Sequence, residues 1–133
     1  MLERDPAGWV RLVLGAFDGK PILVDSDIST VSGAADKVVR LERPEPFVLH
    51  FEAFASWDST LLARAMNYNA AHHRRHLIPV DSVLVLLRPE ADHYSLTGVY
   101  RVVAPVSGKV HVLEYGLLRA WDLDLEAVLR GSL

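Results

Sequence analysis

Two carboxylates, Asp36 and Glu52, are the side chains whose types and spacing could support chemistry in this sequence. Residues 34–42 and 46–56 both alternate like β-strands, and a three-residue loop containing Pro44 separates them. A hairpin with that loop places Asp36 directly opposite Glu52 on one face. Like charges so close together are destabilising unless a cation lies between them or one of them is protonated. The spacing therefore predicts a carboxylate pair that could hold a divalent cation.

The strand predicted over residues 46–56 has two unlike faces. The face that carries Glu52 also carries Val48, His50 and Phe54, so two ionisable groups lie among apolar neighbours. We predict that His50 is a polar group that supports Glu52. The opposite face is wholly apolar and is expected to pack in the core; it consists of Phe47, Leu49, Phe51, Ala53 and Ala55.

Residues 58–76 predict the longest helix of the chain. Beside its apolar stripe, Arg64, Tyr68 and His72 recur four residues apart and share one row. This row either marks an ordinary boundary between core and solvent or points its polar tips at the carboxylate pair. The stripe that is expected to lie on the sheet is Leu61, Leu62, Ala65, Met66 and Ala70.

His72 and His76 stand four residues apart near the end of that helix, a spacing that zinc sites use. The residue after His72 is His73, so the glutamate of the two-histidine zinc helix is missing. Histidines and arginines in a last turn also interact favourably with the helix dipole and its free carbonyls. We therefore expect residues 72–76 to end the helix rather than to bind zinc.

Hydrophobic periodicity predicts an α/β (α+β) fold in a single domain over residues 1–133. A three-strand antiparallel meander precedes the long helix, and a return strand at residues 80–88 follows it. The continuous apolar run of the return strand is typical of a strand buried beside a parallel neighbour, which should be the third strand. The other expected elements are a helix that starts at Asp5, a first strand at 21–28, a polar link at 29–33, a loop at 89–93, strands at 97–103 and 109–118, and a C-terminal helix at 122–129.

Composition is that of an ordinary globular protein. The chain has 133 residues, 50% of them hydrophobic, and no cysteine, which excludes disulfides and thiolate metal sites. The amino-terminal residues do not resemble a signal peptide, and no apolar run approaches the length of a membrane span, so we expect a cytoplasmic protein without a membrane partner. The net charge of −3 argues against a broad phosphate-binding surface.

Four stretches resemble the Rpn-like, putative-transposase family of the PD-(D/E)XK nuclease superfamily, and in particular its short bacterial members. The resemblance covers most of the chain, and its motifs are specific only when taken together. The stretches are ADKVVR at residues 35–40, PFVLHFE at 46–52, RAMNYNA at 64–70, and VLVLLRPEAD at 83–92 running on to LTG at 96–98.

The resemblance implies a restriction-endonuclease-like core: a helix, a three-strand antiparallel meander, a helix, and a return strand parallel to the third strand. In that superfamily, an Asp on the second strand and a Glu on the third bind a divalent cation, and Asp36 and Glu52 match them by position. Mg²⁺ or Mn²⁺ would suit these oxygen ligands and would lower the pKa of bound water for attack on DNA. A Lys or Gln normally stands two residues after the Glu, but this chain has Phe54 there.

Phe54 leaves three interpretations open, because a phenyl ring cannot hold water or meet a developing charge. The favoured one is a nuclease-like domain with a degenerate site and little or no catalysis. The second is an active Mg²⁺-dependent DNA endonuclease that uses Asp36 and Glu52, with His50, Arg64 and Tyr68 in support. The third is a purely structural or homo-oligomeric module in which Glu52 forms a salt bridge with an arginine. The expected partners are accordingly DNA or a second copy of the chain.

Overall fold

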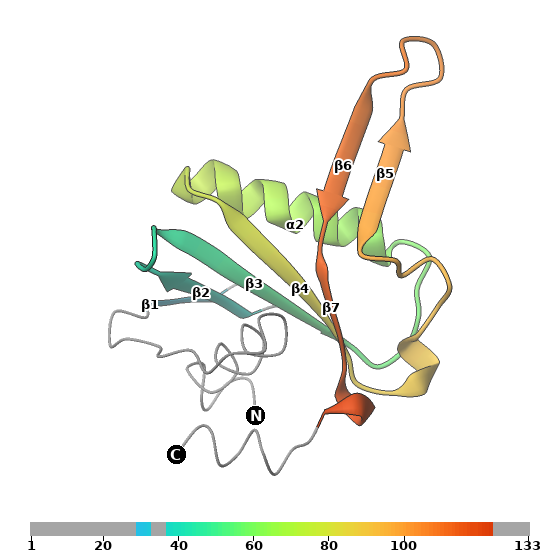
Figure 1. Cartoon of the computed structure of the whole chain (residues 1–133), viewed down its shortest axis with the longest axis horizontal. Helices are drawn as coiled ribbons and strands as arrows, with labels where there is room; N and C mark the ends of the chain where they lie inside the picture. The colour runs from blue at the N-terminus through green and yellow to red at the C-terminus, as the bar shows by residue number, and fades with distance from the viewer. Residues whose placement is uncertain (1–28, 33–36, 124–133) are drawn as a thin grey trace.

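The computed structural model describes residues 29–32 and 37–123. In this part of the chain a mixed sheet packs against one helix, and a two-stranded hairpin forms a separate sheet that projects beyond them (Figure 1). The main elements are β1 (Ser29–Ser32), β2 (Lys37–Leu41), β3 (Phe47–Phe54), α2 (Leu61–His76), β4 (Val80–Leu86), β5 (Val99–Val103), β6 (Val110–Glu114) and β7 (Gly116–Arg119). Two short 3₁₀ turns cover Pro89–Ala91 and Ala120–Asp122.

The main sheet has the strand order β1-β2-β3-β4-β7. Its first three strands form an antiparallel meander, and β4 and β7 then run parallel to their inner neighbours. The parallel pairing of β3 with β4 follows from the helix between them, since only a long crossover can return the chain in the same direction. The predicted antiparallel pairing of the second and third strands and the parallel return strand are therefore confirmed, whereas the predicted first strand at 21–28 lies outside the described residues.

The register between β2 and β3 is the one predicted from the three-residue loop. Leu41 pairs with Phe47 next to the loop, and Lys37 pairs with Phe51 at the far end of β2. Asp36 lies outside the described residues, so its pairing with Glu52 stays a prediction.

The two faces of β3 enter two different hydrophobic clusters, as its alternation predicts. Phe54 packs with α2 on one side, whereas Leu49 and Phe51 pack on the other. The cluster under α2 also contains Leu61, Leu62, Ala65, Met66, Leu84, Leu86, Ala91, Leu96, Leu113 and Tyr115. The opposite cluster also contains Val39, Leu41, Val83, Val85 and Leu118, with Phe47 and Ala53 against it.

Helix α2 begins later than predicted, at Leu61 rather than at residue 58. The Asp58 carboxylate accepts hydrogen bonds from the backbone N–H and the hydroxyl of Thr60, which close a turn before the helix and lower the pKa of Asp58. The helix ends with Leu77 in the left-handed conformation, at φ 57°. Within the described residues, no helix is long and apolar enough to span a membrane.

The stripe predicted for α2 is confirmed at its first four positions, which are buried against the sheet. Its fifth position was predicted wrongly, because Ala70 is exposed. The neighbouring Asn69 forms hydrogen bonds to β4 instead. From its third turn onward the helix therefore meets the sheet through polar contacts.

Two further expectations were wrong. Residues 29–32 form strand β1, paired with β2, and not a polar link. The run at 109–118 is two strands in two sheets: β6 pairs with β5, and β7 joins the main sheet beside β4. Tyr115 marks the change of sheet, since its N–H donates to the carbonyl of Gly98 and its hydroxyl accepts from the N–H of Thr97. The predicted helix at Asp5, the strand at 21–28 and most of the C-terminal helix lie outside the described residues.

One ion pair joins the end of β7 to the loop after β4. The guanidinium of Arg119 donates from Nε to Asp92 Oδ2 at 2.8 Å and from Nη2 to Asp92 Oδ1 at 3.3 Å. These bonds lower the pKa of Asp92 and raise the pKa of Arg119. The two-point contact fixes the loop against the edge strand.

We predict that Asp92→Asn lowers the melting temperature at pH 7. Because its folded pKa is depressed, Asp92 contributes its full stability above its unfolded pKa of about 3.9 and loses it as the pH falls through the folded value. The difference in melting temperature between wild type and variant, measured by circular dichroism, should therefore shrink as the pH falls below about 3.9. Glu90→Gln, an exposed change in the same loop, is the control; equal effects of both variants at pH 7 would contradict the prediction.

Candidate functional site

The candidate residues of β3 lie beneath α2, inside the protein. His50, Glu52 and Phe54 are all buried on the same side of the strand. Glu52 is 5% exposed and His50 is fully buried. A carboxylate or imidazole in the interior needs hydrogen-bond or charge partners. The residues around these side chains therefore determine what the site can do.

His50 belongs to a hydrogen-bonded network that ties β3, β4 and α2 together. Its Nδ1 lies 2.8 Å from the Ser82 hydroxyl, on the residue that pairs with it across the parallel strands. Asn69 of α2 donates from Nδ2 to the same hydroxyl at 2.9 Å and to the carbonyl of Val80 at 3.1 Å. Ser82 thus connects one helix residue with one residue of the central strand.

Two residues of the predicted helix row cover His50. The Tyr68 ring meets the imidazole edge-on with centroids 6.2 Å apart, and the His72 ring lies at 5.2 Å. Arg64, the first residue of the row, is instead exposed and pairs with Asp58 at 3.8 Å. Of the three residues in the row, Tyr68 and His72 therefore contact the buried network, whereas Arg64 lies in solvent.

Phe54 occupies the position of the expected Lys or Gln, and its side chain is part of the core. It is 8% exposed and belongs to the cluster that includes Leu61 and Ala65 of α2 and Leu86 of β4. A polar side chain here would have to displace helix contacts. Nothing at this position can activate water.

The predicted Mg²⁺ or Mn²⁺ site at Asp36 and Glu52 stays a prediction, because Asp36 lies outside the described residues. Among them there is no group of three or more His, Asp or Glu side chains that could hold a metal. The groups bonded around His50 are a hydroxyl and an amide, whereas these ions prefer carboxylates and water. Of the predicted metal pair, only Glu52 falls within this part of the chain.

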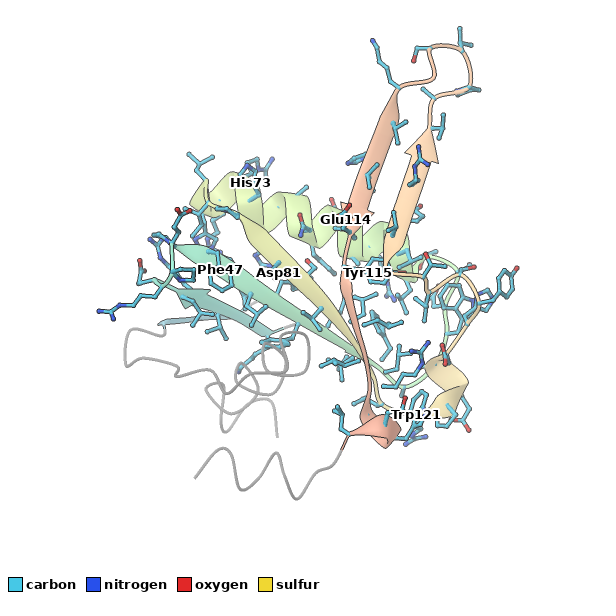
Figure 2. The ribbon with its side chains drawn as sticks, in the orientation of Figure 1. Phe47, His73, Asp81, Glu114, Tyr115 and Trp121 are labelled. Carbon is cyan, nitrogen blue, oxygen red and sulfur yellow. The ribbon has the colours of Figure 1, made fainter. Side chains whose placement is uncertain are left out.

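A histidine in the last turn of α2 binds the chain that follows the helix, so the predicted bonds to the helix carbonyls stay a prediction. The Nδ1–H of His73, labelled in Figure 2, donates to the carbonyl of Ile78 at 2.8 Å. His76 is half-buried, and loss of solvation lowers its pKa, helped by the positive charge of Arg75 and by His72 and Arg40. Arg40 itself pairs with Glu42 at 2.6 Å.

Two residues of the network, Ser82 and Asn69, were not predicted from the sequence. The available signal was a polar residue that interrupts an apolar pattern: Ser82 near the start of the return strand, and Asn69 beside the stripe of the helix. A buried polar residue needs a partner, so two such interruptions on elements that pack together predict a contact between them.

A shallow hollow lies at the start of β3 and β4. It is lined in part by Phe47, Asp81 and Glu114, which Figure 2 labels with Tyr115. Asp81 alternates with Ser82 and so lies on the other side of the sheet from α2; partial removal of water raises its pKa. The hollow shares one residue with the network under the helix, since Val80 lines the hollow and its carbonyl accepts the hydrogen bond from Asn69.

Comparisons with models of protein families, with curated proteins and with solved structures found no match. The function must therefore be inferred from the geometry. Ser82 and His50 resemble a nucleophile and a base in type, but both are fully buried, so a substrate cannot reach them. The arrangement instead holds a helix onto a sheet.

We predict that Ser82→Ala lowers the free energy of unfolding by about 1–3 kcal/mol, because His50 and Asn69 each lose a buried hydrogen-bond partner. Urea denaturation measures the change. Ser59→Ala, an exposed change just before α2, should stay within about 0.5 kcal/mol of wild type. Equal stabilities of the two variants would show that the network contributes nothing.

We predict that His76 titrates below 6.5 in the folded protein, as followed by the NMR signal of its imidazole. Arg75→Gln should move the pKa of His76 upward by removing a positive neighbour. Arg74→Gln, one position away in the same turn, is the control and should leave it unchanged. A measured pKa of 6.5 or above in wild type contradicts the prediction.

Proposed function

We propose that this chain is a domain with a PD-(D/E)XK nuclease-like, restriction-endonuclease-like core that has lost catalysis and serves in binding. The observation that carries the proposal is Phe54, whose ring fills the core where a nuclease needs a polar group beside the acid. A hydrophobic contact there stabilises the packing of α2 on the sheet. The residue at position 54 therefore contributes to the stability of the fold and not to catalysis.

The order and direction of the described strands support the nuclease-like core. Three antiparallel strands, a helix and a strand parallel to the third follow one another as the resemblance implies. The match of Asp36 and Glu52 to the two metal-binding acids of the superfamily depends on the register predicted from the sequence. The observed pairing of β2 with β3 has that register.

The buried network supports the loss of catalysis. In a metal-dependent nuclease the carboxylates face a cleft that admits DNA, whereas Glu52 and His50 lie under α2. The cationic side chain nearest in the helix row, Arg64, pairs with Asp58 in solvent and is a poor general base in any case.

The second candidate is an active Mg²⁺-dependent DNA endonuclease that uses Asp36 and Glu52. The register of β2 and β3 favours it, because that register, continued by one residue, pairs the two acids. Phe54 counts against it, because an apolar ring stands where the superfamily carries the Lys or Gln that assists the attacking water.

Calorimetric titration of Mn²⁺ into the full chain, with plasmid nicking assayed on the same sample, tests the proposal. We expect no saturable binding tighter than about 1 mM and no nicking above the protein-free blank. Glu52→Gln and Asp36→Asn are matched controls that remove charge but keep shape. Micromolar binding that both variants abolish, together with nicking, would establish the endonuclease and overturn the proposal. Binding of Mn²⁺ without nicking would show that the acid pair is a metal site, and it would agree with the proposed loss of catalysis.

A further inference from the structure

The β5–β6 hairpin projects from the body of the structure as an ordered arm (Figure 1). It forms its own two-stranded sheet. At its base, Tyr100 and Leu113 pack against the cluster under α2. At its tip, the N–H of Ala104 donates to the carbonyl of Lys109, and the N–H of Gly108 donates back to the carbonyl of Ala104.

One side of this arm is a valine face, consisting of Val99, Arg101, Val103, Val110, Val112 and Glu114. The pairings Val99 with Glu114, Arg101 with Val112, and Val103 with Val110 place these six residues on the same side. The four valines are between 42% and 53% exposed. Single exposed valines are ordinary, but four neighbours on a rigid sheet form a patch of the kind that marks an interaction site.

The charges on the valine face make it complementary to itself. Arg101 and Glu114 lie diagonally across the two strands and carry opposite charges. A twofold axis in the plane of the face, oblique to the strands and midway between Arg101 and Glu114, sets Arg101 of each copy against Glu114 of the other. About the same axis, Val99 and Val112 of each copy meet the face of the second copy, so that apolar surface and opposite charges are both matched.

We propose that the valine face binds the same face of a second copy of this chain. A two-stranded hairpin is marginal alone, and stacking two of them makes a small sandwich in which each covers the apolar side of the other. Six side chains per copy bury less than the roughly 800 Å² per partner of a standard interface, so the dimer is weak, with a Kd on the order of 100 µM. The proposal does not depend on the nuclease-like core.

Sedimentation velocity from about 1 µM to about 500 µM tests the proposal. Wild type should change from monomer to dimer over this range. Val112→Lys, on the valine face, should stay monomeric, whereas Val102→Lys, on the opposite side of the same hairpin, should behave as wild type; the two valines are 47% and 46% exposed. Circular dichroism checks that both variants fold. A wild type that stays monomeric, or two lysine variants that behave alike, would overturn the proposal.

A charge exchange tests the contact between Arg101 and Glu114. Arg101→Glu and Glu114→Arg should each weaken self-association roughly tenfold, because each creates two like-charge contacts across the twofold axis. An equal mixture of the two variants should form heterodimers at least as tightly as wild type associates, since all cross-contacts are then opposite in charge. A mixture that associates no better than either variant alone would contradict the proposed geometry.

Discussion

Hydrogen bonding of β3 along both of its edges is the constraint on which the rest of the described structure depends. The strand is paired with β2 over Phe47–Phe51 and with β4 over Val48–Phe54. Each of its side chains must enter one of two packed layers. His50 and Glu52 are thereby held inside the protein, and α2 has to supply polar atoms where it crosses them.

Because β3 and β4 run parallel, the residue pairs that face the helix change from polar to apolar along the two strands. His50 stands beside Ser82 and Phe54 beside Leu86, with Glu52 and Leu84 between these pairs. The helix follows the same gradient, with Leu61 at the apolar end and Asn69 at the polar end. Glu52 therefore lies at the boundary between a hydrogen-bonded network and a hydrophobic cluster, where its surroundings differ from those of a carboxylate in an open cleft.

Much of this core followed from the sequence, because a pleat of period two and a short loop leave one register that buries both apolar faces. The parallel return strand followed from its apolar run. The position of strand β1 could not be predicted, because Ser29–Ser32 has no apolar alternation. These residues form a strand through their backbone pairing with β2. The change of sheet at Tyr115 was equally hidden, because alternation reveals a strand but not its neighbour. In the site, the sequence predicted that His50 and Glu52 share one face of the strand. Ser82 and Asn69 belong to the site only because they form a hydrogen bond with each other, and neither position alone indicates that bond.

The separation of the two sheets at Tyr115 has a consequence for how the chain can vary. The ladder of β5 and β6 is independent of the main sheet, and its turn lies far from the core along the arm (Figure 1). Adding or removing two residues in each strand would change the reach of the arm while every side chain kept its side. The hairpin is thus the segment in which insertions and deletions can accumulate over evolution without disturbing the register of β3.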